Sequence, residues 1–178
     1  MQIFFFDTET TGFGPEDRVI QFAWLFGKYV RETGEFFLER TMNQYINIDE
    51  EIPEEAFNIH KINKEKLAPF LKMEAYMPEL MEYFYKADLC VWHNISFDIR
   101  MMRQEMEKIL YRVPEWTLAP KLFCTMKDTP GFTKWPKLWE LYKHLFWEEM
   151  HNAHDAMYDI AATKDCFLNM LRSGKIKL

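Results

Sequence analysis

The stretch IFFFDTETTG, residues 3–12, decides the fold. Its first four residues form a short apolar run, which is typical of a central strand buried on both faces. Asp7 and Glu9 follow two positions apart, and side chains at that spacing in an extended chain point the same way. Paired carboxylates are the oxygen ligands that Mg²⁺ prefers. An acidic strand end leading into a turn is the alternative interpretation.

The segments that follow predict the rest of the sheet. Residues 19–26 and 35–46 have the aromatic and β-branched character of strands, and short turns rich in Gly and Pro precede them. Such short connections predict an antiparallel meander of three strands. Beyond it, helices are expected for a short segment from Pro53 and for residues 74–86, 96–111, 137–146 and 155–171, with strands at 88–92 and 122–126. This order predicts an α/β fold, a mixed sheet of three antiparallel strands plus parallel strands, flanked by helices.

Length and composition suit a single domain over residues 1–178. Apolar residues make up 48% of the chain and charged residues 28%, an ordinary balance for a globular protein. Aromatic residues reach 17%, so the core is expected to consist largely of packed rings.

Charge and cysteine usage exclude some classes of protein. The net charge is −6, which argues against a protein that coats long duplexes by counterion release, although not against one that grips a strand end. Cys90, Cys124 and Cys166 match no zinc spacing and fit a reducing compartment. No apolar stretch reaches membrane-spanning length, and no basic leader precedes Asp7. We therefore expect a cytoplasmic protein with no membrane partner.

A third carboxylate is expected at the segment HNISFD, residues 93–98. The segment joins the strand at 88–92 to the next helix, with Ser96 as the expected N-cap and Asp98 in the first turn. The helix dipole alone explains an acid at that position. The functional interpretation is a carboxylate that faces Asp7 and Glu9.

A fourth carboxylate and a histidine lie in HNAHDAMYD, residues 151–159. Asp159 falls within the last helix, and His154 falls near its start, where the ring could lean over the same cleft. A histidine with a pKa near neutrality can take a proton from an attacking water. Taken alone, each residue is better explained as a surface residue, a histidine beside a solvated acid.

In this order, DTETTG, HNISFD and HDAMYD resemble the three motifs of the DEDDh exonucleases, the DnaQ-like proofreading family. The resemblance implies an RNase H-like fold and a 3′→5′ exonuclease that releases nucleoside 5′-monophosphates. It implies that two divalent cations, Mg²⁺ or Mn²⁺, are held by Asp7, Glu9 and Asp159 and by Asp7 with Asp98 through water. His154 is the implied general base. Two bound dications would change the net charge from −6 to −2, because −6 + 4 = −2.

The segment EAFNIHKI, residues 55–62, resembles a further stretch of polymerase proofreading subunits. The resemblance implies that Glu55 and His60 approach the terminal nucleotide. Lys61 departs from the pattern, because those subunits usually carry Gly there.

Other residues between the motif positions are expected to contact substrate. Thr8 and Thr10 alternate with the acidic residues and should lie near sugar and phosphate, and Asn94 is a further candidate. Phe97, like Phe13, could stack on a base or belong to the core. The tryptophans at 135, 139 and 147 are expected to pack the C-terminal helices, and the lysines at 134, 137 and 143 to be solvated.

The favoured substrate is the 3′ end of DNA, single-stranded or frayed, as in proofreading during replication, with a DNA polymerase as a candidate partner. An RNA exonuclease similar to oligoribonuclease or RNase T is the closest alternative, since only contacts near the 2′-OH would differ. An inactive nucleic-acid-binding or polymerase-docking module is the alternative from another class. Preferred metal, oligomeric state and membership of a polymerase complex stay open.

Overall fold

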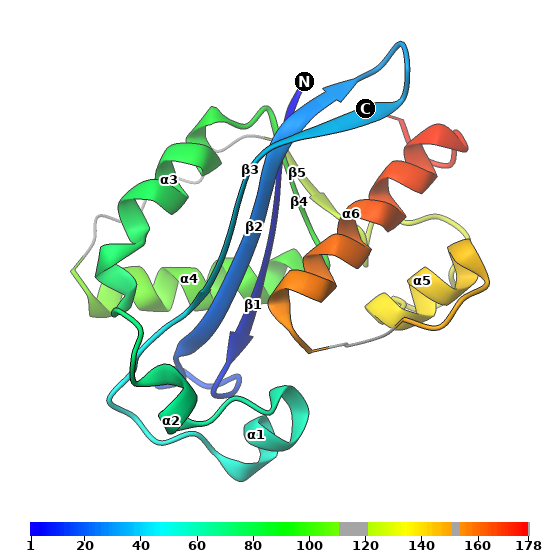
Figure 1. The fold of residues 1–178 in the computed structure, drawn as a ribbon. Coiled ribbons are helices and arrows are strands. Elements are labelled where there is room, and N and C mark those ends of the chain that lie inside the picture. The colour runs from blue at the N-terminus through cyan, green and yellow to red at the C-terminus, as the bar shows by residue number, and fades with distance from the viewer. Residues whose placement is uncertain (111–120, 151–153, 178) are drawn as a thin grey trace.

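The computed structural model describes residues 1–110, 121–150 and 154–177. In these residues one five-stranded sheet has the order β3-β2-β1-β4-β5 (Figure 1). The strands are β1 (Gln2–Thr10), β2 (Val19–Val30), β3 (Glu35–Tyr45), β4 (Leu89–Trp92) and β5 (Lys121–Cys124). β2 pairs antiparallel with both β1 and β3, whereas β4 is parallel to β1 and to β5. The predicted mixed sheet, an antiparallel meander joined to a parallel portion, is confirmed.

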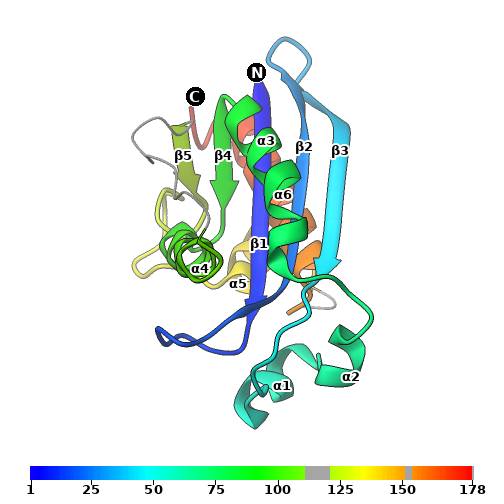
Figure 2. The same ribbon diagram turned by 90° about the vertical axis from the view of Figure 1, so that its left-hand side faces the viewer.

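Helices cover both faces of the sheet. They are α1 (Glu54–His60), α2 (Lys64–Leu67), the 3₁₀ turn η1 (Met73–Ala75), α3 (Met77–Lys86), α4 (Ile95–Lys108), α5 (Leu138–Phe146) and α6 (Ala156–Arg172). Figures 1 and 2 show α3 and α4 on one face and α5 and α6 on the other. The short helices α1 and α2 lie beyond the end of the sheet at which β1 stops.

Alternate residues of β1 pack against opposite helical layers, because side chains of a strand alternate between its faces. The ring of Phe5 meets Phe167 of α6, with 5.8 Å between centroids. The ring of Phe4 instead meets Phe84 of α3 at 6.1 Å. Each face therefore has its own apolar core, largely of rings as expected, and β1 is the layer between the two cores.

The observed elements differ from the predicted ones mainly at their ends. β1 runs on to Thr10, so the acidic residues belong to the strand, and its pairing with β2 shifts register between Glu9 and Thr10. The predicted N-cap at Ser96 is wrong. Helix α4 begins at Ile95 after Asn94, whose φ of 63° places it in the left-handed region that asparagine tolerates. The predicted helix end at Tyr111 lies outside the described residues.

Two expectations about compartment can be compared with the structure. All three cysteines are buried and free. Among the described residues, no helix is long and apolar enough to cross a membrane.

Candidate active site

Two carboxylates from β1 meet the start of α6 at the end of the sheet. Asp7 and Glu9 share the face of β1 that packs against α6, as their spacing predicts. Side-chain ligand atoms of Glu9, His154 and Asp159 all lie within 4.8 Å of one another. Asp7 lines the same cleft as Asp159 and His154. The structure thus brings together four of the five residues expected to carry the chemistry.

The fifth residue, Asp98, lies behind the cleft rather than in its wall. Only 2% of Asp98 is exposed. The hydroxyl of Thr8, which points to the other face of β1, donates a hydrogen bond to Asp98 Oδ1 at 2.8 Å. The negative charge of Asp98 nevertheless reaches Asp7 and raises its pKa.

The two residues of the third motif are linked by the backbone. His154 precedes α6 with a φ of 70°, and its amide donates to Asp159 Oδ2 at 3.2 Å. The neighbouring Asp155 caps the helix by accepting from the amide of Met157 at 3.0 Å. Asp159 Oδ1 is buried and has no hydrogen-bond partner among the described residues. Residues 151–153, which open the quoted segment, lie outside the described residues.

Burial disfavours ionisation of the four carboxylates, and the charges of neighbouring acids add to this effect for Asp7, Glu9 and Asp159. Burial, followed by the charge of Asp159, raises the pKa of Glu9 to about 8. Burial also raises the pKa of Asp98 and of Asp159 to about 7 each. The pKa of Asp7 lies well above its usual range because of burial and the surrounding acids.

Such a cluster fits divalent cations. Hard oxygen ligands with too much negative charge are stabilised when cations bind between them. The unpartnered buried Asp159 Oδ1 is the atom that most clearly needs such a cation.

A cavity of about 500 Å³ opens beside the cluster, within the range of about 300–1,000 Å³ that small-molecule sites occupy. Its wall comprises Asp7 to Phe13, Asp17, Pro53, Glu55, Ala56, Ile59, His60, Asn94, Phe97, His154 and Asp159. All six residues expected to contact substrate line it. The hydroxyls of Thr8 and Thr10, however, donate inside the protein, to Asp98 and to the Gly12 carbonyl at 2.8 Å each. Both hydroxyl protons are therefore already used.

Helix α1 supplies the far wall of this cavity. Burial lowers the pKa of His60 to about 4, so the ring is neutral. The amide of Ile62 donates to His60 Nδ1 at 3.0 Å, which places the proton on Nε2. That buried Nε2 has no hydrogen bond of good geometry in the described structure. The next residue, Lys61, ends α1 with a φ of 57°, a conformation that favours glycine.

An aromatic edge borders the cavity opposite α1. Phe13 is 71% exposed and therefore does not belong to the core. Its ring centroid lies 5.5 Å from that of Phe97. Arg100 lies 5.7 Å from the Phe97 ring centre and donates to the Phe13 carbonyl at 2.8 Å. Phe13 is thus an exposed ring, whereas Phe97 is half-buried and packs against the core, and base contact stays a prediction for both.

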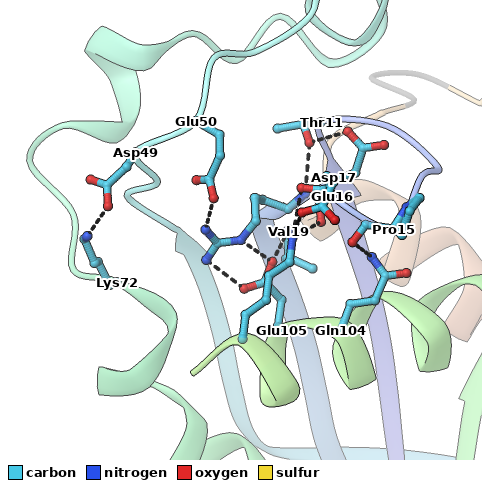
Figure 3. Close-up of polar contacts among 12 residues, drawn as sticks. Thr11, Pro15, Glu16, Asp17, Val19, Asp49, Glu50, Lys72, Gln104 and Glu105 are labelled. Atoms are coloured by element: carbon cyan, nitrogen blue, oxygen red, sulfur yellow. Dashed lines mark hydrogen bonds and ion pairs between the residues drawn. The ribbon is translucent and has the colours of Figure 1, made fainter. Parts of the chain in front are cut away.

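A buried ion pair holds the loop that forms one wall (Figure 3). Glu105 of α4 is fully buried and accepts from Arg18 Nε and from the amide of Val19, each at 2.9 Å. Arg18 also binds Glu50, in the segment that leads to α1. The pair thus ties α4, the loop after β1 and the approach to α1 together. The sequence offered no signal for it, because the two residues are 87 positions apart.

Sequence reasoning also assigned three tryptophans wrongly. Trp135, Trp139 and Trp147 are 65%, 44% and 90% exposed, so they are not packed among the C-terminal helices. Trp135 and Trp139 line a second cavity that includes Asp7, His154 and Asp159. Whether a tryptophan is buried depends on the direction in which its segment places the side chain. The spacing of these three residues along the chain does not reveal that direction.

The fold and the site together define the class of RNase H-like nucleases. Residues 4–167 match the family model RNase_T, described as Exonuclease. The chain is 29% identical over 168 residues to the 3′-5′ exonuclease DinG of Bacillus subtilis, a match that covers 93% of this chain and 17% of DinG. It is 28% identical over 102 residues to the DNA polymerase III subunit epsilon of Rickettsia conorii, which covers 56% of this chain and 42% of the subunit.

Among solved structures, the nuclease domain of 3′hExo, a DEDDh family member bound to rAMP, superposes with a TM-score of 0.77. It is 16% identical and covers 98% of this chain and 93% of that one, which supports the fold alone. The chain belongs to the RNase_T exonuclease family. It spans less than half the length of the two curated relatives.

Proposed function

We propose that this protein is a 3′→5′ exonuclease that hydrolyses the terminal phosphodiester of DNA at single-stranded or frayed 3′ ends. The observation that carries the proposal is the convergence of Asp7, Glu9, His154 and Asp159 at a cavity of nucleotide size. The products are nucleoside 5′-monophosphates. Residues 1–178 are proposed to act as one exonuclease domain, and a cytoplasmic location stays a prediction.

Four carboxylates would hold the two cations. Asp7, Glu9 and Asp159 would bind one, and Asp7 with Asp98 the second. Because Asp98 is buried behind the cleft and accepts from Thr8, we propose that it would hold this cation through a water. When bound, Mg²⁺ or Mn²⁺ would stabilise the charge that develops on the attacking and leaving oxygens.

His154 is the proposed general base. Burial, aided by the charge of Lys137, lowers its pKa, so the ring is neutral at pH 7 and able to accept a proton. Its nitrogen lies within 4.8 Å of the ligand oxygens of Glu9 and Asp159. A water placed there would lose its proton to His154 as it attacks phosphorus.

The cavity beside the cluster is the proposed site of the terminal nucleotide. Asn94 makes no capping hydrogen bond, and Asn94 and His60 both line the cavity, so both are proposed to contact sugar or phosphate. Glu55 and the backbone of Thr8 and Thr10 line the same space, and Phe97 is placed to contact the base.

DNA is favoured because the segment around Glu55 and His60 resembles proofreading subunits, and because one relative is a DNA polymerase III subunit. That relative makes a DNA polymerase a candidate partner. The RNA exonuclease and the inactive docking module are the alternatives that the experiment separates.

The test compares matched DNA and RNA oligonucleotides labelled at the 5′ end. We expect a ladder that shortens from the 3′ end of DNA, mononucleotide products, a resistant circular strand, and no activity in excess chelator. Faster cutting of RNA would select the alternative substrate. No cutting of either would select the docking module, and cutting of the circle would overturn the exonuclease assignment.

A further inference from the structure

The second cavity leaves the active site in another direction. It has a volume of about 390 Å³ and shares Asp7, Asn94, His154 and Asp159 with the nucleotide cavity. The nucleotide cavity extends from these residues toward α1, whereas the second extends toward α5; the two helices lie apart in Figure 1. The cleft therefore continues past the carboxylates.

The wall of this second branch combines two exposed indoles with the side chain of Lys137, and Lys127 lies beside it. Trp135 is 65% and Trp139 44% exposed. Lys137 lies between them in the chain and forms no ion pair within the described residues. Lys127 Nζ lies 5.3 Å from the Trp135 ring centre. Apart from Asp7 and Asp159, which are assigned to cations, no acidic side chain of residues 1–110, 121–150 and 154–177 lines the branch. Aromatic faces beside ammonium groups are the chemistry that binds a single nucleic-acid strand.

The segment that carries these side chains has contacts at Pro136 and at Lys137. His93 Nδ1 lies 2.9 Å from Thr125 Oγ1, and its ring also hydrogen-bonds the backbone of Pro136. The amide of Lys137 donates to Glu140 Oε2 at 2.8 Å, at the start of α5. The exposed rings are thus presented by a fixed backbone, which reduces the entropy that a strand must overcome to stack on them.

The direction of the strand follows from the order of the sites. If the terminal nucleotide occupies the cavity toward α1 and the scissile phosphate lies at the carboxylates, the preceding nucleotides must leave through the other branch. We propose that Trp135, Lys137 and Trp139 bind the nucleotides immediately 5′ of the scissile phosphate. The indoles stack on bases and the ammonium group of Lys137 contacts a phosphate. This inference rests on the proposed function and makes a strand of several nucleotides the preferred substrate, with little dependence on base identity.

The test compares two substrates in the presence of Mn²⁺. One is a single-stranded oligothymidylate. The other is the p-nitrophenyl ester of thymidine 5′-monophosphate, which contains the terminal nucleotide and the scissile bond but no nucleotide 5′ of it. Trp135→Ala and Trp139→Ala are each expected to lower the ratio of kcat/KM for the oligonucleotide to kcat/KM for the ester by about 5-fold to 150-fold, chiefly through KM. Lys137→Gln should reduce the slope of log KM against log salt for the oligonucleotide by about 0.7.

The matched control is Trp147→Ala. Trp147 is 90% exposed at the end of α5 and lines neither cavity, so the ratio should stay at its wild-type value. A variant with a lower melting temperature is replaced by Trp→Leu at the same position, which keeps an apolar side chain and removes the ring face.

The outcomes separate this inference from the proposed function. Hydrolysis of neither substrate by the wild type would contradict the proposed function. Hydrolysis of both, with ratios unchanged in the Trp135 and Trp139 variants, would overturn the strand path and leave the exonuclease intact. An equal loss on both substrates would also overturn it, because the indoles would then act on the chemistry and not on the strand.

Discussion

Replacing Asp98 with Asn is expected to stabilise the metal-free protein while removing its activity. The amide oxygen of Asn can still accept the Thr8 hydroxyl, so the hydrogen bond at 2.8 Å is kept while the charge is lost. Burial raises the pKa of Asp98 from 3.8 to about 7. Ionising it in the folded state therefore costs up to about 4 kcal/mol, at about 1.4 kcal/mol per pKa unit. Asp98 titrates together with a neighbouring acid, so the expected gain is about 2–4 kcal/mol.

The stability gained by replacing Asp98 with Asn should increase as the pH rises. Because the folded-state pKa of Asp98 is above the unfolded value, the folded protein binds more protons, and stability falls as pH rises from about 4 through about 7. Denaturant unfolding in excess chelator should show Asp98→Asn well above the wild type at about pH 8 and close to it at about pH 4. Adding Mn²⁺ at the higher pH should stabilise the wild type more than the variant, since the wild type offers the additional charge.

Asp49→Asn is the control for the substitution itself. The Asp49 side chain is 82% exposed and pairs with Lys72, which lowers its pKa, so its loss should change stability only slightly and in the opposite direction. If Asp98→Asn were no more stable than the wild type at pH 8 without metal, the idea of a strained carboxylate cluster would be wrong.

Three other changes have definite expected outcomes. Lys61→Gly should raise the melting temperature by about 2–4 °C, since relief of the left-handed strain is worth about 1 kcal/mol; a lower value would contradict the assigned φ. Glu105→Ala should lower the free energy of unfolding, measured in urea, by about 3–5 kcal/mol, because Arg18 loses its buried partner. A loss of stability smaller than that caused by replacing an exposed acidic residue would show that the Arg18–Glu105 ion pair does not stabilise the fold. His154→Ala should lose about 10²–10⁴ in kcat yet keep its Mn²⁺-induced thermal shift. Raising the pH should partly restore its rate. If His154→Ala were active and His151→Ala inactive, the motif alignment would be wrong and His154 would be only a surface residue.

The sheet could be predicted because its signals are local. The apolar run before Asp7 and the alternating segments after it determine which faces are buried. Because side chains alternate between the two faces of a strand, Asp7 and Glu9 are then predicted to share a face of β1. Because the connections between the first three strands are short, neighbouring strands are expected to pair antiparallel.

Helix starts were harder to predict because they depend on backbone conformation. Ser96 satisfies the residue preference for an N-cap, yet Asn94 takes that place by adopting a left-handed conformation. Asp98 was predicted as a ligand, but its position behind the cleft depends on a hydrogen bond to Thr8, 90 residues away. No local pattern encodes such a contact.

The exposure of the tryptophans could not be predicted from the sequence either. Spacing and composition assigned Trp135 and Trp139 to the core, because most large aromatic residues in this chain are buried. Their exposure depends on the backbone of residues 134–137, which His93 fixes from another strand end.

The central position of β1 has a consequence for how the protein loses activity. Amides in a strand paired on both sides exchange with solvent only when the whole sheet opens, whereas a short helix at the edge opens at lower free energy. Asp7 and Glu9 stand on β1, which pairs with β2 along its length and with β4 at Ile3–Phe5, and Glu55 and His60 stand on α1, beyond the end of the sheet (Figure 1). On mild warming, deuterium uptake should therefore appear in α1 well before β1. The protein would then pass through a stage that still holds cations but no longer grips the nucleotide.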